Sequence, residues 1–209
     1  MSEQAGKTPP EWMDVSRETM ELLVAFVGLV LKWNPAINLI SRKSVTEIWE
    51  RHVYDSAQLL ALIPTNAVRL VDLGSGAGFP GVILAIMARE ALPKLRVTLV
   101  EADKRKAVFL SEVLCLLTLN ADVVSSRIED LPQQCADVLT ARALAPLAKL
   151  CEYADRHLGP SGTALFSKGA RVMEEIAEAR LVWSFDVVKR RSKSESDAII
   201  LSLTNVRHV

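Results

Sequence analysis

The sequence is poor in cysteine and aromatic residues and carries no excess of charge. Its 209 residues contain three Cys, four Trp, two Tyr and five Phe, and 25 acidic residues balance 25 basic ones. Zero net charge argues against a protein that coats nucleic acid generally, so any RNA contact must depend on local basic patches. The three cysteines, Cys115, Cys135 and Cys151, show no C-x-x-C spacing, which predicts buried free thiols and a reducing compartment.

Long apolar runs and export signals are also missing. The apolar run over residues 22–31 is far shorter than the roughly 20 residues that cross a bilayer. The N-terminal residues show no basic segment followed by an apolar one, as an export signal would require. These absences predict a cytoplasmic protein without a membrane partner. Because half of the residues are hydrophobic, the chain can form one domain with a full core, or one domain with an appendage.

What the sequence does contain is a glycine-rich stretch, VRLVDLGSGAGFPG, over residues 68–81. The short apolar run at its start predicts a buried strand, and Pro80 with the apolar residues after it predicts a helix. Between them, Gly74, Gly76 and Gly78 allow positive φ angles and a close approach of a ligand to the backbone. A strand, a glycine loop and a helix in this order build a nucleotide-type site at the carboxyl end of the strand.

Two ligand classes fit this loop. Residues 76–81 formally match the dinucleotide fingerprint G-x-G-x-x-G, which holds a pyrophosphate. Asp72, however, precedes the first glycine, and its charge would oppose a diphosphate and favour a ligand with an ammonium or sulfonium group. Residues 72–78, DLGSGAG, have the form that resembles the cofactor loop of S-adenosylmethionine-dependent methyltransferases. The alternative to both is a glycine-rich turn that binds no ligand.

Strands and helices alternate after the loop. The pattern predicts an α/β, doubly wound, Rossmann-like fold with a seven-stranded, mostly parallel sheet that ends in an antiparallel C-terminal hairpin. Such a hairpin favours the methyltransferase, because a dinucleotide-binding domain would continue with parallel crossovers. We expect a disordered N-terminus (1–10), an N-terminal helical cap (11–66) and a methyltransferase domain (67–209). The predicted strands are 68–73, 96–101, 121–126, 136–142, 163–167, 185–190 and 198–204, and the predicted helices are 16–33, 45–63, 80–91, 104–119, 146–158 and 171–183.

Residues at the ends of the predicted strands are candidates for ligand contacts. Glu101 ends the second strand of the main domain, where a carboxylate can accept hydrogen bonds from ribose hydroxyls; a solvated strand end is the alternative. Ile128 and Glu129 follow the third strand, where the methyltransferase fold places the adenine; an ordinary helix start is the alternative. Arg142 is a lone cation ending the fourth strand, where a charge is costly unless paired. It could hold the cofactor's carboxylate, a phosphate or carbonyl of the substrate, or a core acid.

His52 and Asp55 form a further candidate pair in the second N-terminal helix. They are three residues apart and so share one helical face. They could act as an acid–base pair or as half of a metal site, but no third ligand is evident, so no metal is predicted. From the residues alone, a satisfied pair on the protein surface is the simpler interpretation. Basic residues at 42–43, 104–106 and 189–193 would bind phosphate only if they converged.

Several separated blocks together resemble one methyltransferase family. They are K-W-N at 32–34 with N-L at 38–39, R-H-x-x-D-S at 51–56, D-L-G-S-G-A-G-F-P-G at 72–81, S-R-x-E at 126–129, R-A at 142–143 and K-G at 168–169. This combination resembles the RsmG (GidB) family of bacterial 16S ribosomal RNA guanine-N7 methyltransferases. Two departures are small: Glu101 stands where relatives often carry Asp, and Ala77 where Pro is common.

The resemblance implies S-adenosylmethionine as the cofactor and methyl transfer to N7 of a specific guanine. The partner it implies is 16S rRNA, within a small ribosomal subunit particle, and the protein is expected to be a monomer. It also implies that His52, Asp55 and Arg142 lie near the substrate. The cofactor contacts that it implies are Gly74, Phe79, Ile128, Glu129 and Arg142, to which the sequence pattern adds Gly76, Gly78 and Glu101.

Methylation at N7 needs no general base, because that nitrogen carries a free lone pair. An enzyme acting on exocyclic amines usually shows an N-P-P-Y-like turn, where this chain reads A-R-A-L at 141–144. Catalysis is then mainly the positioning of an unpaired or extruded guanine, for which Phe79, Trp33 and Tyr54 are the local aromatic candidates. Two alternatives remain: an NAD-dependent oxidoreductase that uses the glycine loop, and a non-catalytic adaptor that binds partners through its apolar N-terminal helix.

Overall fold

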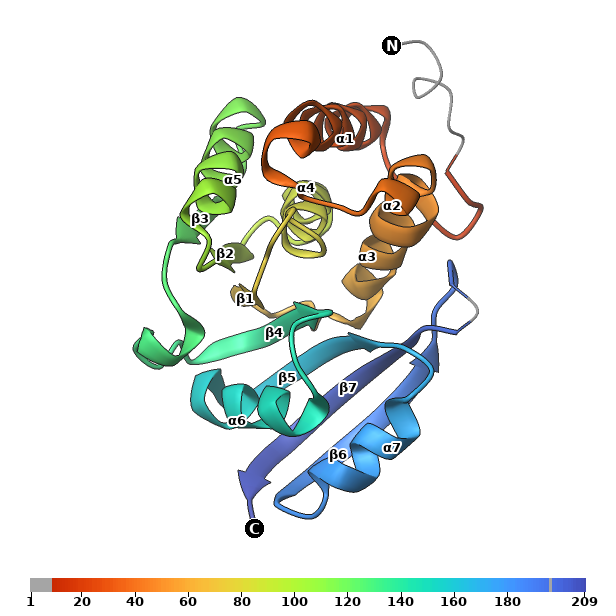
Figure 1. Ribbon diagram of the computed structural model, residues 1–209. Helices are drawn as coiled ribbons and strands as arrows, with labels where there is room; N and C mark the ends of the chain where they lie inside the picture. The colour runs from red at the N-terminus through yellow and green to blue at the C-terminus, as the bar shows by residue number, and fades with distance from the viewer. Residues whose placement is uncertain (1–8, 196) are drawn as a thin grey trace.

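A seven-stranded sheet runs through the molecule in the order β3-β2-β1-β4-β5-β7-β6 (Figure 1). The computed structural model describes residues 9–195 and 197–209, so most of the segment predicted to be disordered lies outside the described residues. The strands from β3 to β5 are parallel, and β7 runs antiparallel to β5 and β6. The predicted α/β fold with a closing hairpin is confirmed. The strands are β1 (Arg69–Leu73), β2 (Arg96–Val100), β3 (Ala121–Val124), β4 (Ala136–Arg142), β5 (Leu158–Lys168), β6 (Trp183–Arg191) and β7 (Ile199–His208).

Helices cover both faces of the sheet (Figure 1). One apolar core joins α1, α4 and α5 to the face that carries Leu70 and Leu99, and a second core joins α6 and α7 to the face that carries Val71 and Leu139. Because both faces are buried, the parallel strands read as nearly continuous apolar runs. The helical segments are α1 (Arg17–Ile37), α2 (Arg42–Thr46), the π-helical η1 (Trp49–Tyr54), α3 (Asp55–Ala57), the 3-10 segments η2 (Gln58–Leu62) and η3 (Ile128–Asp130), α4 (Gly81–Ala91), α5 (Lys104–Leu116), α6 (Leu147–His157) and α7 (Val172–Ala179).

Helix α1 is longer than predicted. Ser16 caps its start, as expected. The predicted end at residue 33 was wrong, because the helix continues through Pro35 to Ile37. Pro35 lies in the last turn, where a proline removes a single hydrogen bond, and the Asn34 carbonyl still accepts a hydrogen bond from the Asn38 amide at 2.9 Å.

Helix α1 belongs to the core despite its apolar character. By length and composition alone it could cross a membrane, but Phe26, Val27 and Val30 are fully buried, and the helix packs against α4 and α5. The N-terminal segment thus shares a core with one face of the sheet. The division of the chain near residue 66 stays a prediction.

The second N-terminal helix is broken into short pieces. A continuous helix over residues 45–63 was predicted, but the chain forms α2, η1, α3 and η2 in succession. In η1 the Asp55 amide donates to the His52 carbonyl, whereas α-helical winding would direct it to the Arg51 carbonyl. The Asp55 amide therefore does not occupy the Arg51 carbonyl. π-helical segments such as η1 often occur at functional sites.

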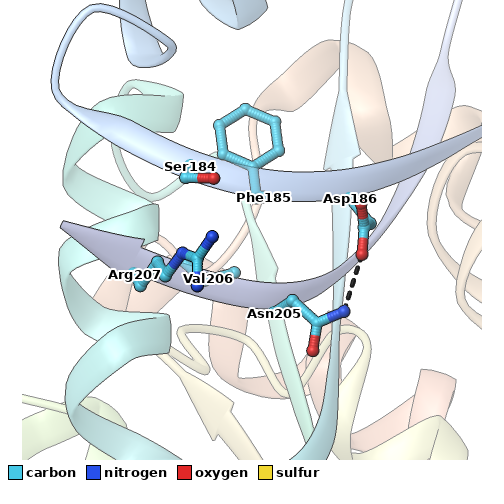
Figure 2. A pocket seen from close by; sticks show the side chains of 6 residues that line it. All are labelled: Ser184, Phe185, Asp186, Asn205, Val206 and Arg207. Atoms are coloured by element: carbon cyan, nitrogen blue, oxygen red, sulfur yellow. Dashed lines mark hydrogen bonds between the residues drawn. The ribbon is translucent and has the colours of Figure 1, made fainter. Parts of the chain in front are cut away.

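The C-terminal hairpin of β6 and β7 has a bulge near its base. The register shifts between Ser184 and Asp186, and Asn205 takes a positive φ of 55°. The Asn205 Nδ2 donates to Asp186 Oδ2 at 2.6 Å (Figure 2). This irregularity borders a surface cavity of about 340 Å³ that also touches Arg207. The bulge lies at the opposite end of the hairpin from its turn, residues 192–198, and so is remote from the site described below.

Only one cysteine has the predicted burial. Cys151 is buried, but Cys115 is exposed and Cys135 is partly exposed. Cys115 lies on the outer side of α5, and Cys135 precedes β4 in a surface loop, where an apolar sequence context does not ensure burial. Burial raises the pKa of the Cys151 thiol to about 12, so this thiol stays protonated and unreactive.

Candidate active site

The glycine loop joins β1 to α4 at the carboxyl end of β1. Gly74, Gly76 and Gly78 have positive φ angles of 65°, 55° and 93°. A side chain would be strained at these positions, and a Cβ at Gly74 would come within 2.6 Å of Leu144 Cδ1. Only glycine fits this path, which presents bare backbone at the carboxyl edge of the sheet.

Asp72 lies beneath the loop. Its side chain is 0 % exposed; Oδ1 accepts a hydrogen bond from Thr140 Oγ1 at 2.7 Å, and Oδ2 accepts one from the Gly81 amide at 3.3 Å. Burial raises the pKa of this carboxyl to about 6. Asp72 therefore ties β1 to β4 and to the start of α4, and it acts on a cationic ligand only through space.

Glu101 holds two backbone segments together. Its Oε2 accepts a hydrogen bond from the Gly76 amide at 2.7 Å, and its Oε1 accepts one from the Asp103 amide at 2.8 Å. Each carboxylate oxygen has a second lone pair. The same group can therefore fix the glycine loop and still accept hydrogen bonds from two neighbouring hydroxyls, as the predicted ribose contact requires.

Ile128 and Glu129 lie in η3, after β3. Ile128 is buried and Glu129 is exposed. Glu129 Oε1 accepts a hydrogen bond from the Tyr153 hydroxyl, and this bond lowers the pKa of Glu129. Sequence reasoning missed Tyr153, which comes from α6. The parallel pairing of β1, β2 and β3 brings the segments after these strands to the same edge of the sheet. We call Gly74, Gly76, Gly78, Glu101, Ile128 and Glu129 the loop half of the site.

Arg142, at the end of β4, links the sheet to η1. Its Nη1 donates to the Arg51 carbonyl at 3.0 Å and to His52 Nδ1 at 2.6 Å. Its guanidinium lies 5.5 Å from the centre of the Phe79 ring, close enough for a cation–π interaction. Arg142 thus donates to the carbonyl that the Asp55 amide does not occupy. Burial lowers the pKa of Arg142, although an arginine stays charged in proteins.

His52 is held in one orientation and one tautomer. Its ring stacks on Phe79 with centroids 5.0 Å apart and planes at 25°. Burial, assisted by the charges of Arg142 and Arg51, lowers the pKa of His52 to about 3, so the imidazole is neutral. Because a guanidinium can only donate, Nδ1 is the acceptor and the ring proton resides on Nε2. The pair on the protein surface suggested by the residues alone was wrong for His52.

Asp55 is buried and anchors the hairpin turn. It is 4 % exposed, and its Oδ1 accepts hydrogen bonds from Gln58 Nε2 and Ser192 Oγ, both at 2.9 Å. Arg51 reaches the same turn through an ion pair with Glu195 at 2.9 Å. The turn between β6 and β7 is thereby fixed to the N-terminal segment.

These side chains border a surface cavity of about 360 Å³ at the ends of β4 and β5. On its other side Lys168 forms an ion pair with Glu175 at 2.5 Å and donates to the Ala145 carbonyl at 3.0 Å. Sequence reasoning did not place these two residues in the site. Lys168 carried the same signal as Arg142, a cation ending an apolar strand, whereas Glu175 carried none. We call Arg51, His52, Asp55, Arg142, Lys168 and Glu175 the cavity half of the site.

Comparison with known proteins decides the family. A family model described as rRNA small subunit methyltransferase G matches residues 19–200. The chain is 51% identical over 197 residues to the Ribosomal RNA small subunit methyltransferase G of Cereibacter sphaeroides. The aligned region covers 94% of this chain and 96% of that relative. This chain belongs to the rRNA small subunit methyltransferase G family. The family member from Paracoccus denitrificans is 45% identical over 94% of this chain and 100% of its own length, and the resemblance read from separated sequence blocks is confirmed.

Solved structures agree with the fold of this rRNA small subunit methyltransferase G family member. A SAM-dependent methyltransferase from Aquifex aeolicus superposes with a TM-score of 0.59 at 16% identity, covering 85% of this chain and 97% of that one. TYW2 from M. jannaschii, in complex with AdoMet, gives a TM-score of 0.58 at 15% identity, covering 84% and 80%. At these identities the likeness concerns the fold alone, and it confirms the predicted Rossmann-like methyltransferase architecture.

Within this family member, the aromatic candidates separate by position. Phe79 lies between the two halves of the site, against His52 and the Arg142 guanidinium. Trp33 packs against α5, and Tyr54 packs against its neighbours in the N-terminal segment. Phe79 is only 4 % exposed, so its ring supports His52 and does not offer a free face to a base.

Proposed function

We propose that this protein transfers the methyl group of S-adenosylmethionine to N7 of a specific guanine in small-subunit (16S-type) ribosomal RNA. The observation that carries the proposal is the meeting of the two halves at one edge of the sheet. A glycine loop fixed by Glu101 lies beside a strand whose Arg142 holds His52 at an open cavity. The family relatives are named as ribosomal RNA small subunit methyltransferases, which supports the substrate.

The loop half suits the cofactor. Bare backbone at Gly74 and Gly78 admits the methionine portion, and Glu101 is placed to accept hydrogen bonds from the ribose hydroxyls. Ile128 and Glu129 border the position of the adenine in this fold. Arg142 lies between the halves, where it can balance a carboxylate of the cofactor or an oxygen of the RNA.

The reaction needs no proton acceptor. S-adenosylmethionine supplies an electrophilic methyl group: the N7 lone pair forms the new bond to carbon, the carbon–sulfur electron pair goes to sulfur, and the methylated guanine gains a positive charge. His52 agrees with this scheme, because a histidine with a pKa of about 3 is a weak base. The protein's contribution is to place N7 in line with the methyl group, which can supply roughly 7–11 kcal/mol of barrier lowering.

The substrate is a shaped RNA region, met in the cytoplasm within a small ribosomal subunit particle by a monomer of this protein. Zero net charge gives little general affinity for RNA, since non-specific binding comes from phosphate neutralisation. Arg191, at the end of β6, and Lys193, in the hairpin turn, instead adjoin Ser192, which is bonded to Asp55. That position suits contacts to phosphates around the target base.

The proposal is tested by methyl transfer from radiolabelled S-adenosylmethionine to small ribosomal subunits, free 16S rRNA and random RNA of equal length. We expect label at N7 of one guanine in the ribosomal RNA and none in the random RNA. Calorimetry should detect binding of S-adenosylhomocysteine and no binding of NAD. Equal labelling of random RNA, or heat of binding with NAD alone, would contradict the proposal.

A further inference from the structure

One hydrogen-bond donor in the cavity half is buried without an acceptor. His52 Nδ1 is occupied by Arg142, and His52 Nε2 is enclosed and makes no hydrogen bond to the residues that the structure describes. A buried N–H that lacks a partner costs free energy, so such a group in a site is a sign of a partner that arrives later. Because Arg142 fixes the tautomer, Nε2 can only donate.

An acceptor lies close by in the chain. Asp55 also borders the cavity, and the hydrogen bonds recorded for its carboxylate all fall on Oδ1, from Gln58, Ser192 and Ser194. Within residues 9–195 and 197–209, no hydrogen bond to Oδ2 is found. Asp55, which is 4 % exposed and borders the cavity, therefore offers an acceptor beside an imidazole that can only donate.

We propose that these two groups read the six-membered edge of the target base once its entry has uncovered Nε2: His52 Nε2–H donates to O6 of guanine, and Asp55 Oδ2 accepts from N1–H. The inference rests on the proposed function and names the residues that select the base. Guanine carries an acceptor at position 6 and a donor at N1, whereas adenine carries a donor at position 6 and an acceptor at N1. With adenine, the 6-amino donor would face the His52 donor and the N1 acceptor would face the Asp55 acceptor, so neither hydrogen bond could form.

The order of the groups also suits N7. Asp55 is fixed to the hairpin turn, and His52 stacks on Phe79 of the glycine loop. Along guanine the order is N1, O6, N7. A base whose N1 faces Asp55 and whose O6 faces His52 turns its N7 towards the glycine loop, where the cofactor's methyl group is proposed to lie.

The test pairs protein variants with altered bases. 16S rRNA is prepared by splinted ligation with guanine, inosine or 2-aminopurine at the target position; 2-aminopurine retains N7 but lacks O6 and N1–H. For the wild-type protein, we expect kcat/KM to fall about tenfold or more with 2-aminopurine and to change less than about threefold with inosine, which retains both groups. The His52→Phe variant keeps an aromatic ring on Phe79 but removes the N–H. It should lose activity on guanine by a similar factor and lose almost none on 2-aminopurine.

Control variants separate a contact with the base from a structural role. His52→Gln offers Arg142 an acceptor and the base a donor, so it should restore part of the preference for guanine. His208→Phe alters an exposed histidine at the remote end of β7 and should leave both rates unchanged. Calorimetry with S-adenosylhomocysteine should give nearly the same Kd for wild type, His52→Phe and His52→Gln, showing that the fold and the loop half are intact.

The outcomes distinguish this inference from the proposed function. If His52→Phe and His52→Gln lower the rates on guanine and 2-aminopurine by one common factor, His52 does not contact O6 and the inference is overturned. If the wild type methylates 2-aminopurine as well as guanine, neither His52 nor Asp55 reads this edge. If the wild type methylates no guanine N7 at all, the proposed function fails first, and that result is visible without any variant.

Discussion

The two halves of the site are built by different means. In the loop half and directly beneath it, the carboxylates of Glu101 and Asp72 accept hydrogen bonds from backbone amides 2 to 25 residues away in the sequence. In the cavity half, side chains from η1, α3, β4 and the hairpin turn form hydrogen bonds between residues 90 to 137 positions apart in the sequence. The first arrangement depends on local chain geometry, and the second depends on the complete fold. Substitutions should therefore affect the two halves in different ways.

The largest effect is expected from Gly74→Asp in the loop half. The new side chain would sit at a φ of 65° and meet Leu144, and it would add a negative charge to the loop that is proposed to bind the cofactor. A displacement of about 1 Å at such a site can cost about 100-fold in rate, so methylation should fall by at least that factor and S-adenosylhomocysteine binding should be lost in calorimetry. Gly28→Asp is the matched control, because Gly28 has no atom within 4 Å of its Cβ position. Retained binding in Gly74→Asp would show that the loop does not hold the cofactor.

The loop half was predictable because its determinants are local. The sequence alone identifies the three glycines of the loop and the carboxylate of Glu101 after the next strand. In the structure the glycines adopt positive φ angles, and Glu101 accepts a hydrogen bond from the Gly76 amide. Both ends of β4 were predicted correctly, because the apolar run of this strand ends clearly at a single cation, Arg142. The structural role of Asp72 could not be predicted, because its side chain bonds to Thr140 from another strand of the sheet.

The cavity half was predictable only by residue type. The sequence indicates Arg142 as a candidate because it is a cation at a strand end, but it does not indicate which residues Arg142 contacts. They include the Arg51 carbonyl in η1, which the Asp55 amide does not occupy, and sequence periodicity does not distinguish the π-helical winding of η1 from an α-helix. The family resemblance predicted that His52 and Asp55 lie near the substrate, whereas their spacing alone favoured a pair on the protein surface. The hydrogen bond between Asp55 and Ser192 joins residues that are 137 positions apart in the sequence, so no local sequence pattern predicts it.

The second largest effect is expected from Arg142→Ala, which removes the link between the halves. His52 would lose the donor that fixes its tautomer, and Phe79 would lose its cationic neighbour. We expect kcat/KM for the ribosomal RNA to fall by about 100-fold, with a smaller change in the Kd of S-adenosylhomocysteine. Arg142→Lys should recover little, because an ammonium cannot reproduce the two directed contacts. Wild-type activity in a folded Arg142→Ala protein would remove this residue from the site.

A change beneath the loop should appear in stability and its pH dependence. Burial raises the pKa of Asp72 from 3.8 to about 6, so the folded protein binds more protons than the unfolded chain between these values. The stability contributed by the neutral carboxyl is complete below pH 3.8 and is lost as the pH rises through 6. Asp72→Asn removes this loss. Relative to wild type, the variant should gain about 2–4 °C in Tm between pH 5 and pH 7 in calorimetric scans; a difference in Tm that is constant with pH would assign the titration elsewhere.

The smallest effect is expected from Ser192→Ala, which loosens the cavity half alone. The variant removes the Ser192 Oγ contacts to Asp55 and Gln58, so the unfolding free energy should fall by about 1 kcal/mol. The hairpin turn would then hold Asp55 less firmly, and the rate on ribosomal RNA should fall about threefold while the Kd of S-adenosylhomocysteine stays unchanged. Ser202→Ala, on the same hairpin, is the matched control and should change neither quantity, because among the described residues the Ser202 hydroxyl bonds only to the exposed Arg190. A parallel loss of cofactor affinity in Ser192→Ala would mean that the two halves do not act independently.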